Sequence, residues 1–459
     1  MTGFNRTNPP TAGRHNATWT SAFLLLLALL QLALVPVLNG RDVELAPLFR
    51  VDSLGLLFGT AWTLTLATIS IPLVRQSEVR MSGLFLGLIG VDLLVCAYAH
   101  NMVVLAVGWG MAGVGIWASQ NVPGTCSKTN WAIFNAVGPA VIIAILAVAT
   151  GFPIFAPPAG GVAEPWPAVA VMGGALVGAF TVSGGFRDGR ERDKNEGANA
   201  PLTALYALIA PYILAKMLVT APWHPVGAWL LVLFGMLTLL IGGYQAYVAY
   251  VSQEQQGHRP FSYALVGMAL VGFGIAANSP LGAAGATWVM LVGLPWIVAR
   301  WWRWAEIATL VAVVPGLWML SQAALDTGYG VVAALLLPAY VLVAALTFFR
   351  RYETSLGWRW PVTLAVVLSL LAAALPQVVV EAMLKPAVRT MAGGVGALTT
   401  VGIEWGVGML VRTAQGTVPA ALPATGMGLA VFLAAVVLYW LKQLAGRATR
   451  QTGGDTQAE

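Results

Sequence analysis

Residues 173–216 read GGALVGAFTVSGGFRDGRERDKNEGANAPLTALYALIAPYILAK. Two apolar stretches flank a short loop at residues 187–196, in which basic and acidic side chains are concentrated. An uncharged apolar run of roughly 17–25 residues is long enough to cross a bilayer as a helix. Apolar segments separated by a compact charged loop are therefore typical of a protein that crosses the membrane several times.

The rest of the chain repeats this pattern. Of its 459 residues, 58% are hydrophobic and only 9% are charged, whereas soluble domains have about 25% charged residues. A large water-facing domain is thereby excluded. The apolar runs are continuous and do not alternate as in a membrane β-barrel. The sequence predicts an all-α, polytopic transmembrane helical bundle of about fourteen spans, near residues 21–38, 50–74, 82–99, 101–119, 131–152, 165–186, 201–220, 225–251, 262–278, 281–299, 303–323, 329–349, 361–379 and 420–441.

Charge placement predicts one membrane domain, residues 21–441, between cytoplasmic tails at 1–20 and 442–459. With the N-terminus inside, most lysine and arginine residues fall on the cytoplasmic side, as the positive-inside rule requires. We therefore expect a multi-pass protein of the inner (plasma) membrane, with both termini cytoplasmic. Membrane topology accounts for the net charge of +6, so no nucleic-acid partner is expected. One stretch, residues 386–412, fits a fifteenth span, a re-entrant segment or a surface helix.

The candidate ionisable residues inside predicted spans are Asp92, Lys216 and Glu306. Such groups are costly in a bilayer, and each is a candidate for a modified ion path. Other interpretations stay open. Lys216 can extend to the interface, Glu306 can pair with Arg303, and Asp92 can hydrogen-bond a neighbouring helix.

Two prolines near the middle of spans, Pro211 and Pro315, are candidate helix breaks, because proline removes a backbone donor. Broken helices often border transport sites, although proline is also common in membrane helices generally. Histidine and cysteine residues show no metal-ligand spacing. We expect neither a metal site nor a cofactor.

Four passages resemble the antiporter-like membrane subunits of complex I, Mrp-type sodium/proton antiporters and membrane-bound hydrogenases. They follow the family order over about residues 49–350. The passages are 49–54 (FRVDSL), similar to F-x-x-D-x-L; 101–110 (NMVVLAVGWG), similar to N-L-x-x-L-x-x-x-W-E; 178–183 with 200–205 (GAFTVS and APLTAL), similar to F-x-K-S and A-P-x-S-A-L-L-H; and 258–264 (HRPFSYA), similar to K-R-x-L-A-Y-S. The resemblance implies a bundle with inverted repeats and proline-broken helices.

The family's titratable residues are replaced here. Its glutamate after the tryptophan is Gly110, the lysine of its broken helix is Val182, and its next histidine and lysine are Ala207 and Ile213. Lys216 lies nearly one turn beyond Ile213. The resemblance therefore implies a degenerate proton path, since these groups carry protons across the membrane in the family.

The sequence thus predicts a membrane subunit of an ion-translocating NADH:quinone oxidoreductase-like, hydrogenase-like or Mrp-like complex. In enzymatic terms it would be at most a non-redox subunit of a proton-translocating oxidoreductase, with a structural role or a modified ion path. Its partners would be the lipid bilayer, other membrane subunits and a peripheral subunit docked on the 187–196 loop. A stand-alone secondary transporter is the alternative. A membrane enzyme acting on lipids is a third hypothesis, with the same loop as its one candidate catalytic site.

Overall fold

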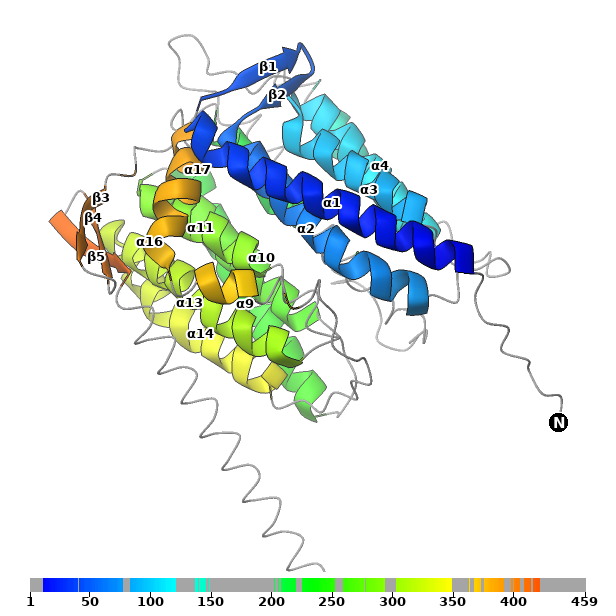
Figure 1. Cartoon of the computed structure of the whole chain (residues 1–459). Coiled ribbons are helices and arrows are strands. Elements are labelled where there is room, and N and C mark those ends of the chain that lie inside the picture. Colours follow the sequence, from blue (N-terminus) through cyan, green and yellow to red (C-terminus); the bar gives the residue numbers. More distant parts are fainter. Residues whose placement is uncertain are drawn as a thin grey trace, which may run out of the picture.

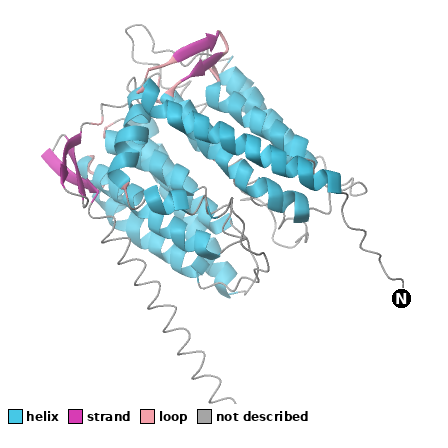
Figure 2. Cartoon of the chain, in the orientation of Figure 1, coloured by secondary structure: helices cyan, strands magenta, loops and turns pink. Residues whose placement is uncertain are grey.

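A computed structural model of the chain describes a bundle of long apolar helices (Figures 1 and 2). The described residues are 11–39, 41–76, 83–120, 137–138, 140–145, 148, 202, 205, 208–219, 225–251, 259–276, 278–293, 303–348, 363, 367–372, 375–391, 398, 400–404, 408–413 and 416–421. The longer helices are α1 (Thr11–Leu38), α2 (Ser53–Gln76), α3 (Gly83–Tyr98), α4 (Met102–Gln120), α8 (Ile209–Met217), α9 (Pro225–Val251), α10 (Arg259–Ala276), α11 (Pro280–Gly293), α13 (Arg303–Asp326) and α14 (Gly330–Phe348).

The helices pack in two groups (Figure 1). Helices α1–α4 form one group and α9–α14 the other. Near residue 380 a short stretch joins them, built of α16 (Pro376–Val379), a π-helical turn (Val380–Leu384) and α17 (Lys385–Thr390). Helix α17 contacts α1, α2 and α11, and α8 contacts α10. The predicted all-α polytopic bundle is therefore confirmed as a fold class.

Helix α2 is surrounded by protein along nearly its whole length. Its apolar segment Ser53–Ser70 is 94% buried. A buried hydroxyl needs a hydrogen-bond partner, and the threonine and serine hydroxyls of α2 donate to backbone carbonyls three or four residues earlier. The helix can therefore carry many hydroxyl groups in an apolar interior without unpaired donors.

Among the described residues, three helical segments are long and apolar enough to cross a membrane: Thr18–Leu38, Ser53–Ser70 and Pro225–Val248. Five shorter apolar helices accompany them, in α3, α4, α10, α11 and α14. The outer sides of α1 and α9 expose large apolar side chains, such as Leu26 and Leu240. Side chains of this kind match lipid and not water.

One end of the bundle carries a β-hairpin of β1 (Val43–Ala46) and β2 (Phe49–Val51). Phe49 bridges to Ala99, just beyond α3, so the hairpin covers the end of that helix. The first residues of α2, which follow β2 directly, lie at this same end (Figure 1).

Part of the structure corrects the interpretation of residues 386–412. Residues 385–390 form α17, and the chain then forms a three-stranded antiparallel sheet of β3 (Thr400–Glu404), β4 (Gly408–Thr413) and β5 (Gly416–Ala421). In β3, Val401 and Ile403 alternate with Gly402, which is the two-residue period of a strand and not of a helix. None of the three expected alternatives included a sheet.

Several predictions from the sequence lie outside the described residues. These are the 187–196 loop, the span near 165–186, the C-terminal tail and all but the first two residues of the span at 420–441. The segment 1–20, expected to be a tail, overlaps α1, which begins at Thr11.

Glycine lets α9 and α10 approach closely. A Cβ atom added to Gly267 would lie 2.6 Å from the carbonyl oxygen of Gly235, and one added to Gly235 would lie 2.7 Å from the carbonyl oxygen of Gly267. Small residues at such contacts are how membrane helices pack backbone to backbone.

We predict that Gly267→Ala lowers the stability of the detergent-solubilised protein by about 1–3 kcal/mol, because the new methyl group forces two backbones apart. Thermal unfolding followed by circular dichroism measures the effect. Gly330→Ala is the matched control, since a Cβ at Gly330 meets nothing within 4 Å. Equal midpoints for the two variants would contradict the close contact.

Candidate functional site

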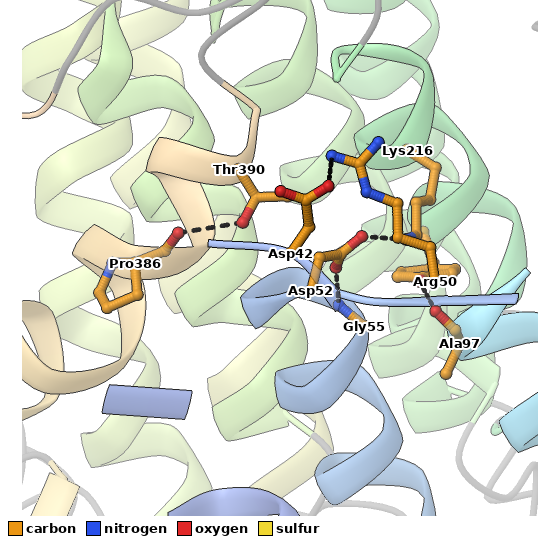
Figure 3. Close-up of polar contacts among 9 residues, drawn as sticks. Asp42, Arg50, Asp52, Gly55, Ala97, Lys216, Pro386 and Thr390 are labelled. Atoms are coloured by element: carbon orange, nitrogen blue, oxygen red, sulfur yellow. Dashed lines mark hydrogen bonds and ion pairs between the residues drawn. The ribbon is translucent and has the colours of Figure 1, made fainter. Parts of the chain in front are cut away.

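The most buried ion pair among the described residues joins Lys216 to Asp52. The Nζ atom of Lys216 lies 2.6 Å from Oδ2 of Asp52, and the two side chains are 2% and 3% exposed (Figure 3). The lysine therefore does not reach solvent as the snorkelling interpretation required. Its ammonium group is compensated inside the protein.

Asp52 is held at the start of α2. Its Oδ1 atom accepts a hydrogen bond from the N–H of Gly55 at 2.6 Å, and its carbonyl oxygen accepts the first helical bond from Leu56. This is the geometry of an N-cap, for which aspartate is among the preferred residues. The carboxylate thus satisfies a free helical donor with one oxygen and binds Lys216 with the other.

The two helix ends favour the charges that they carry. Asp52 lies at the positive N-terminal end of the α2 dipole, and Lys216 lies in the last turn of α8, near the negative end of that dipole. An anion at the first position and a cation at the second are both stabilised. The positions of the two residues at their helix ends thus agree with the signs of the helix dipoles.

An aromatic cluster lies beside the lysine, whose Nζ atom is 5.9 Å from the centroid of the Tyr212 ring. Tyr212, Phe58 and Trp62 form one cluster, with ring centroids 4.7–5.9 Å apart. The Tyr212 hydroxyl donates to the carbonyl oxygen of Ala97 at 2.6 Å, which fixes α8 against the end of α3. All three rings are fully buried. The surroundings thus exclude bulk water from the ammonium–carboxylate contact.

A second polar contact lies beside this cluster. The hydroxyl of Tyr98, at the end of α3, donates to Oε1 of Gln31 in α1 at 2.8 Å. Gly59 of α2 faces this contact, and a Cβ there would collide with the Gln31 amide. Polar residues from α1, α2, α3 and α8 therefore meet at the hairpin end of the bundle, not along the whole membrane depth.

Of the three candidate ion-path residues, Lys216 alone lies in this cluster. Asp92 is half-buried on α3 and forms no hydrogen bond or ion pair with any described residue. Glu306 belongs to the first turn of α13, and its side chain lies outside the described residues. The structure connects Lys216 to Asp52, then, and not to Asp92.

The two candidate helix breaks take different positions. Pro211 is the third residue of α8, within the first turn, where the backbone N–H has no helical acceptor in any case. Pro315 lies inside α13, whose helical segment continues on both sides of it.

Positions that are titratable in the antiporter-like family are apolar here. Ile213 is fully buried, and a Cβ at Gly110 would be 3.4 Å from the Cβ of Ala140. Val182 and Ala207 lie outside the described residues. Within the described part of the chain, no His, Cys, Asp and Glu side chains gather into a group that could hold a metal ion.

Asp52 is the site residue that the sequence interpretation missed. It was noticed only as part of the FRVDSL passage, and not as a partner for Lys216. A signal was present, because an aspartate directly before a long apolar run predicts an N-cap. Its contact with a lysine 164 residues away depends on the fold.

We predict that Lys216→Met destabilises the protein by about 3–5 kcal/mol, because it leaves an uncompensated buried carboxylate. The double variant Asp52→Asn, Lys216→Met should recover most of this loss, since Asn keeps the helix cap without the charge. Thermal unfolding in detergent measures both. Lys385→Met is the matched control, because its pair with Glu381 is solvent-accessible and contributes little. A double variant less stable than Lys216→Met would contradict the coupling.

Comparison with known proteins finds similar folds in chains of membrane complexes. No protein-family model matches the chain, and no curated protein matches it. Solved structures do. A chain of the Mrp complex from Dietzia sp. DQ12-45-1b matches with a TM-score of 0.60 and 16% identity over 95% of this chain. The present chain covers 56% of that Mrp chain.

Two further structures agree. A chain of the membrane-bound sulfane sulfur reductase, an archaeal respiratory membrane complex, matches with a TM-score of 0.62 and 12% identity, over 92% of this chain and 80% of that one. A chain of respiratory complex I from Thermus thermophilus with bound aureothin has a TM-score of 0.58 and 16% identity, over 79% and 93%. At these identities the likeness concerns the fold. The chain therefore has the fold found in membrane subunits of these complexes, which confirms the resemblance to antiporter-like subunits at that level.

Proposed function

We propose that the chain is a membrane subunit of a multi-subunit, ion-translocating complex of the NADH:quinone oxidoreductase-like, hydrogenase-like or Mrp-like kind. It binds no redox cofactor itself, and its own proton route is degenerate. Its contribution is to build and hold the membrane arm beside the conducting subunits. The fold shared with chains of three such complexes supports this proposal.

One observation supports the proposal that the proton route of this chain is degenerate. The buried lysine that lies nearest the family's relay position is engaged by Asp52 at 2.6 Å, at one end of the helices. Ile213, which occupies the position of a family lysine, is fully buried. A proton relay needs titratable groups or water at successive depths. A closed ion pair followed by apolar packing offers neither.

The Asp52–Lys216 ion pair holds together two parts of the chain that are distant in sequence. It joins the start of α2 to the end of α8, while Tyr212 fixes α8 to the end of α3. In the topology expected from the basic residues, these three helix ends all lie on the extracytoplasmic face. The contacts agree with that topology, because they require the three helix ends to share one face. The plasma-membrane location and the cytoplasmic termini are predicted from the basic residues alone.

We predict that an affinity-tagged copy, solubilised gently from its native membrane, co-purifies with further membrane subunits. The loop at 187–196 remains the predicted docking surface for a peripheral subunit, and reversing its charges should remove that subunit alone. Mass spectrometry of the purified material identifies the partners. A stand-alone secondary transporter would instead purify by itself and catalyse ion exchange as a single chain, which would contradict the proposal.

A modified ion path through Asp92, Lys216 and Glu306 remains a prediction of the sequence, and vesicles containing the purified complex test it. If Lys216 has only this structural role, the variant Asp52→Asn, Lys216→Met should form the same pH gradient as the wild type at equal protein content. If Lys216 is a relay, the gradient collapses. Asp92→Asn extends the test, since unchanged pumping excludes Asp92 from the path.

A further inference from the structure

The outward face of α3 and α4 differs from the other exposed faces of the described bundle. Leu88 and Val91 of α3 and Val107 and Met111 of α4 are 53–56% exposed. The two helices lie against each other at the edge of the bundle (Figure 1). We call this surface the Asp92 face, formed by Leu88, Val91, Asp92, Val107, Met111 and Val114.

Glycine brings the two helices together at the level of Asp92. A Cβ at Gly108 would be 3.0 Å from the Asp92 carbonyl oxygen, and one at Gly115 would be 2.9 Å from Ile89. The two backbones are thus in direct contact. Exposed apolar side chains are therefore contributed by both of these adjoining helices.

Asp92 makes this patch unsuitable for lipid alone. It is the tenth of 16 residues in α3, far from either end of that helix, and is half-buried without a hydrogen bond or ion pair to a described residue. A carboxylate at such a depth costs about 2.5–3.5 kcal/mol by insertion measurements. The outer faces of α9 and α14 carry no charged residue, as a surface that meets only acyl chains requires.

A second copy of this chain is poorly suited to neutralise Asp92. Lys216 lies 2% exposed within the bundle and is already bound to Asp52. The transmembrane helices α1, α2, α3, α4, α9 and α14 offer no other lysine or arginine within their described apolar spans. These described spans therefore offer no cation for Asp92.

We propose that the Asp92 face is the docking site for a transmembrane helix of another subunit, and that this helix places a lysine or arginine against Asp92. The inference rests on the proposed function, because it needs a multi-subunit complex. An ion pair formed between two helices satisfies both charges inside the membrane, and the flat patch around it supplies van der Waals contact. The charge of Asp92 selects a partner helix that carries a basic residue, and the apolar side chains around Asp92 pack against that helix.

Photo-crosslinking in native membranes tests the contact. p-Benzoylphenylalanine replaces Val91, which is 55% exposed, or Leu240 on α9, which is 53% exposed and serves as the matched control. We expect Val91 to cross-link to a transmembrane peptide that contains lysine or arginine, and Leu240 to cross-link to lipid. Lipid adducts alone at Val91, from a complex that still co-purifies, overturn the docking site and leave the proposed function standing.

Two other results of the cross-linking experiment would also contradict the proposal. A cross-link from Val91 to a second copy, or to a helix without a basic residue, overturns the proposed partner. A chain that purifies without any partner overturns the proposed function as well.

A charge exchange then tests the ion pair itself. Asp92→Lys should reduce recovery of the cross-linked subunit by about threefold to thirtyfold, the loss expected for one interhelical polar contact. Changing the partner's basic residue to aspartate should restore recovery, which also rules out misfolding of the Asp92→Lys chain. Failure of the reciprocal change to restore the complex contradicts the pair.

Discussion

The contact between Asp52 and Lys216 is the interaction on which the arrangement of the bundle depends. Each group alone would be an uncompensated charge in an apolar interior, which is among the costliest features that a membrane protein can contain. Together they join helices that are 164 residues apart in sequence. The start of α2 and the end of α8 must therefore lie on the same side of the membrane, and every connection between them is constrained to that topology.

The surroundings of the pair explain why it holds. Aspartate caps α2, the lysine ends α8, and the two helix dipoles favour these charges. The pair is buried, and the Tyr212 ring, packed against Phe58 and Trp62, lies beside Lys216. The hydroxyl-rich helix α2 can be fully enclosed because its threonines and serines bond to their own backbone. The buried ion pair thus lies at one end of the bundle, and Ile213, one turn earlier in α8, is fully buried.

The sequence predicted the parts of this fold that depend on local composition. Long uncharged runs predicted the helices, and the described ones begin and end close to the expected residues, as α9 at Pro225–Val251 does. Contacts between distant residues were beyond that kind of reasoning. Lys216 was recognised as costly, but its partner was not, because only the fold brings Asp52 to it. The sheet at 400–421 was missed for another reason: each strand has only five or six residues, so the two-residue alternation of Val401 and Ile403 extends over too few positions to predict a strand.

The resemblance to antiporter-like subunits and the loss of their titratable residues lead to one account. The chain is a membrane subunit that retains the fold of a proton translocator and has apolar side chains in place of the titratable residues of the proton route. A cryo-electron microscopy map of the complex, purified from its native membrane and resolved well enough to show ordered water, tests this most directly. The account predicts a closed Asp52–Lys216 contact and no file of water crossing the helices around Ile213 and Gly110. A continuous chain of water molecules from Lys216 to the opposite membrane face would contradict it.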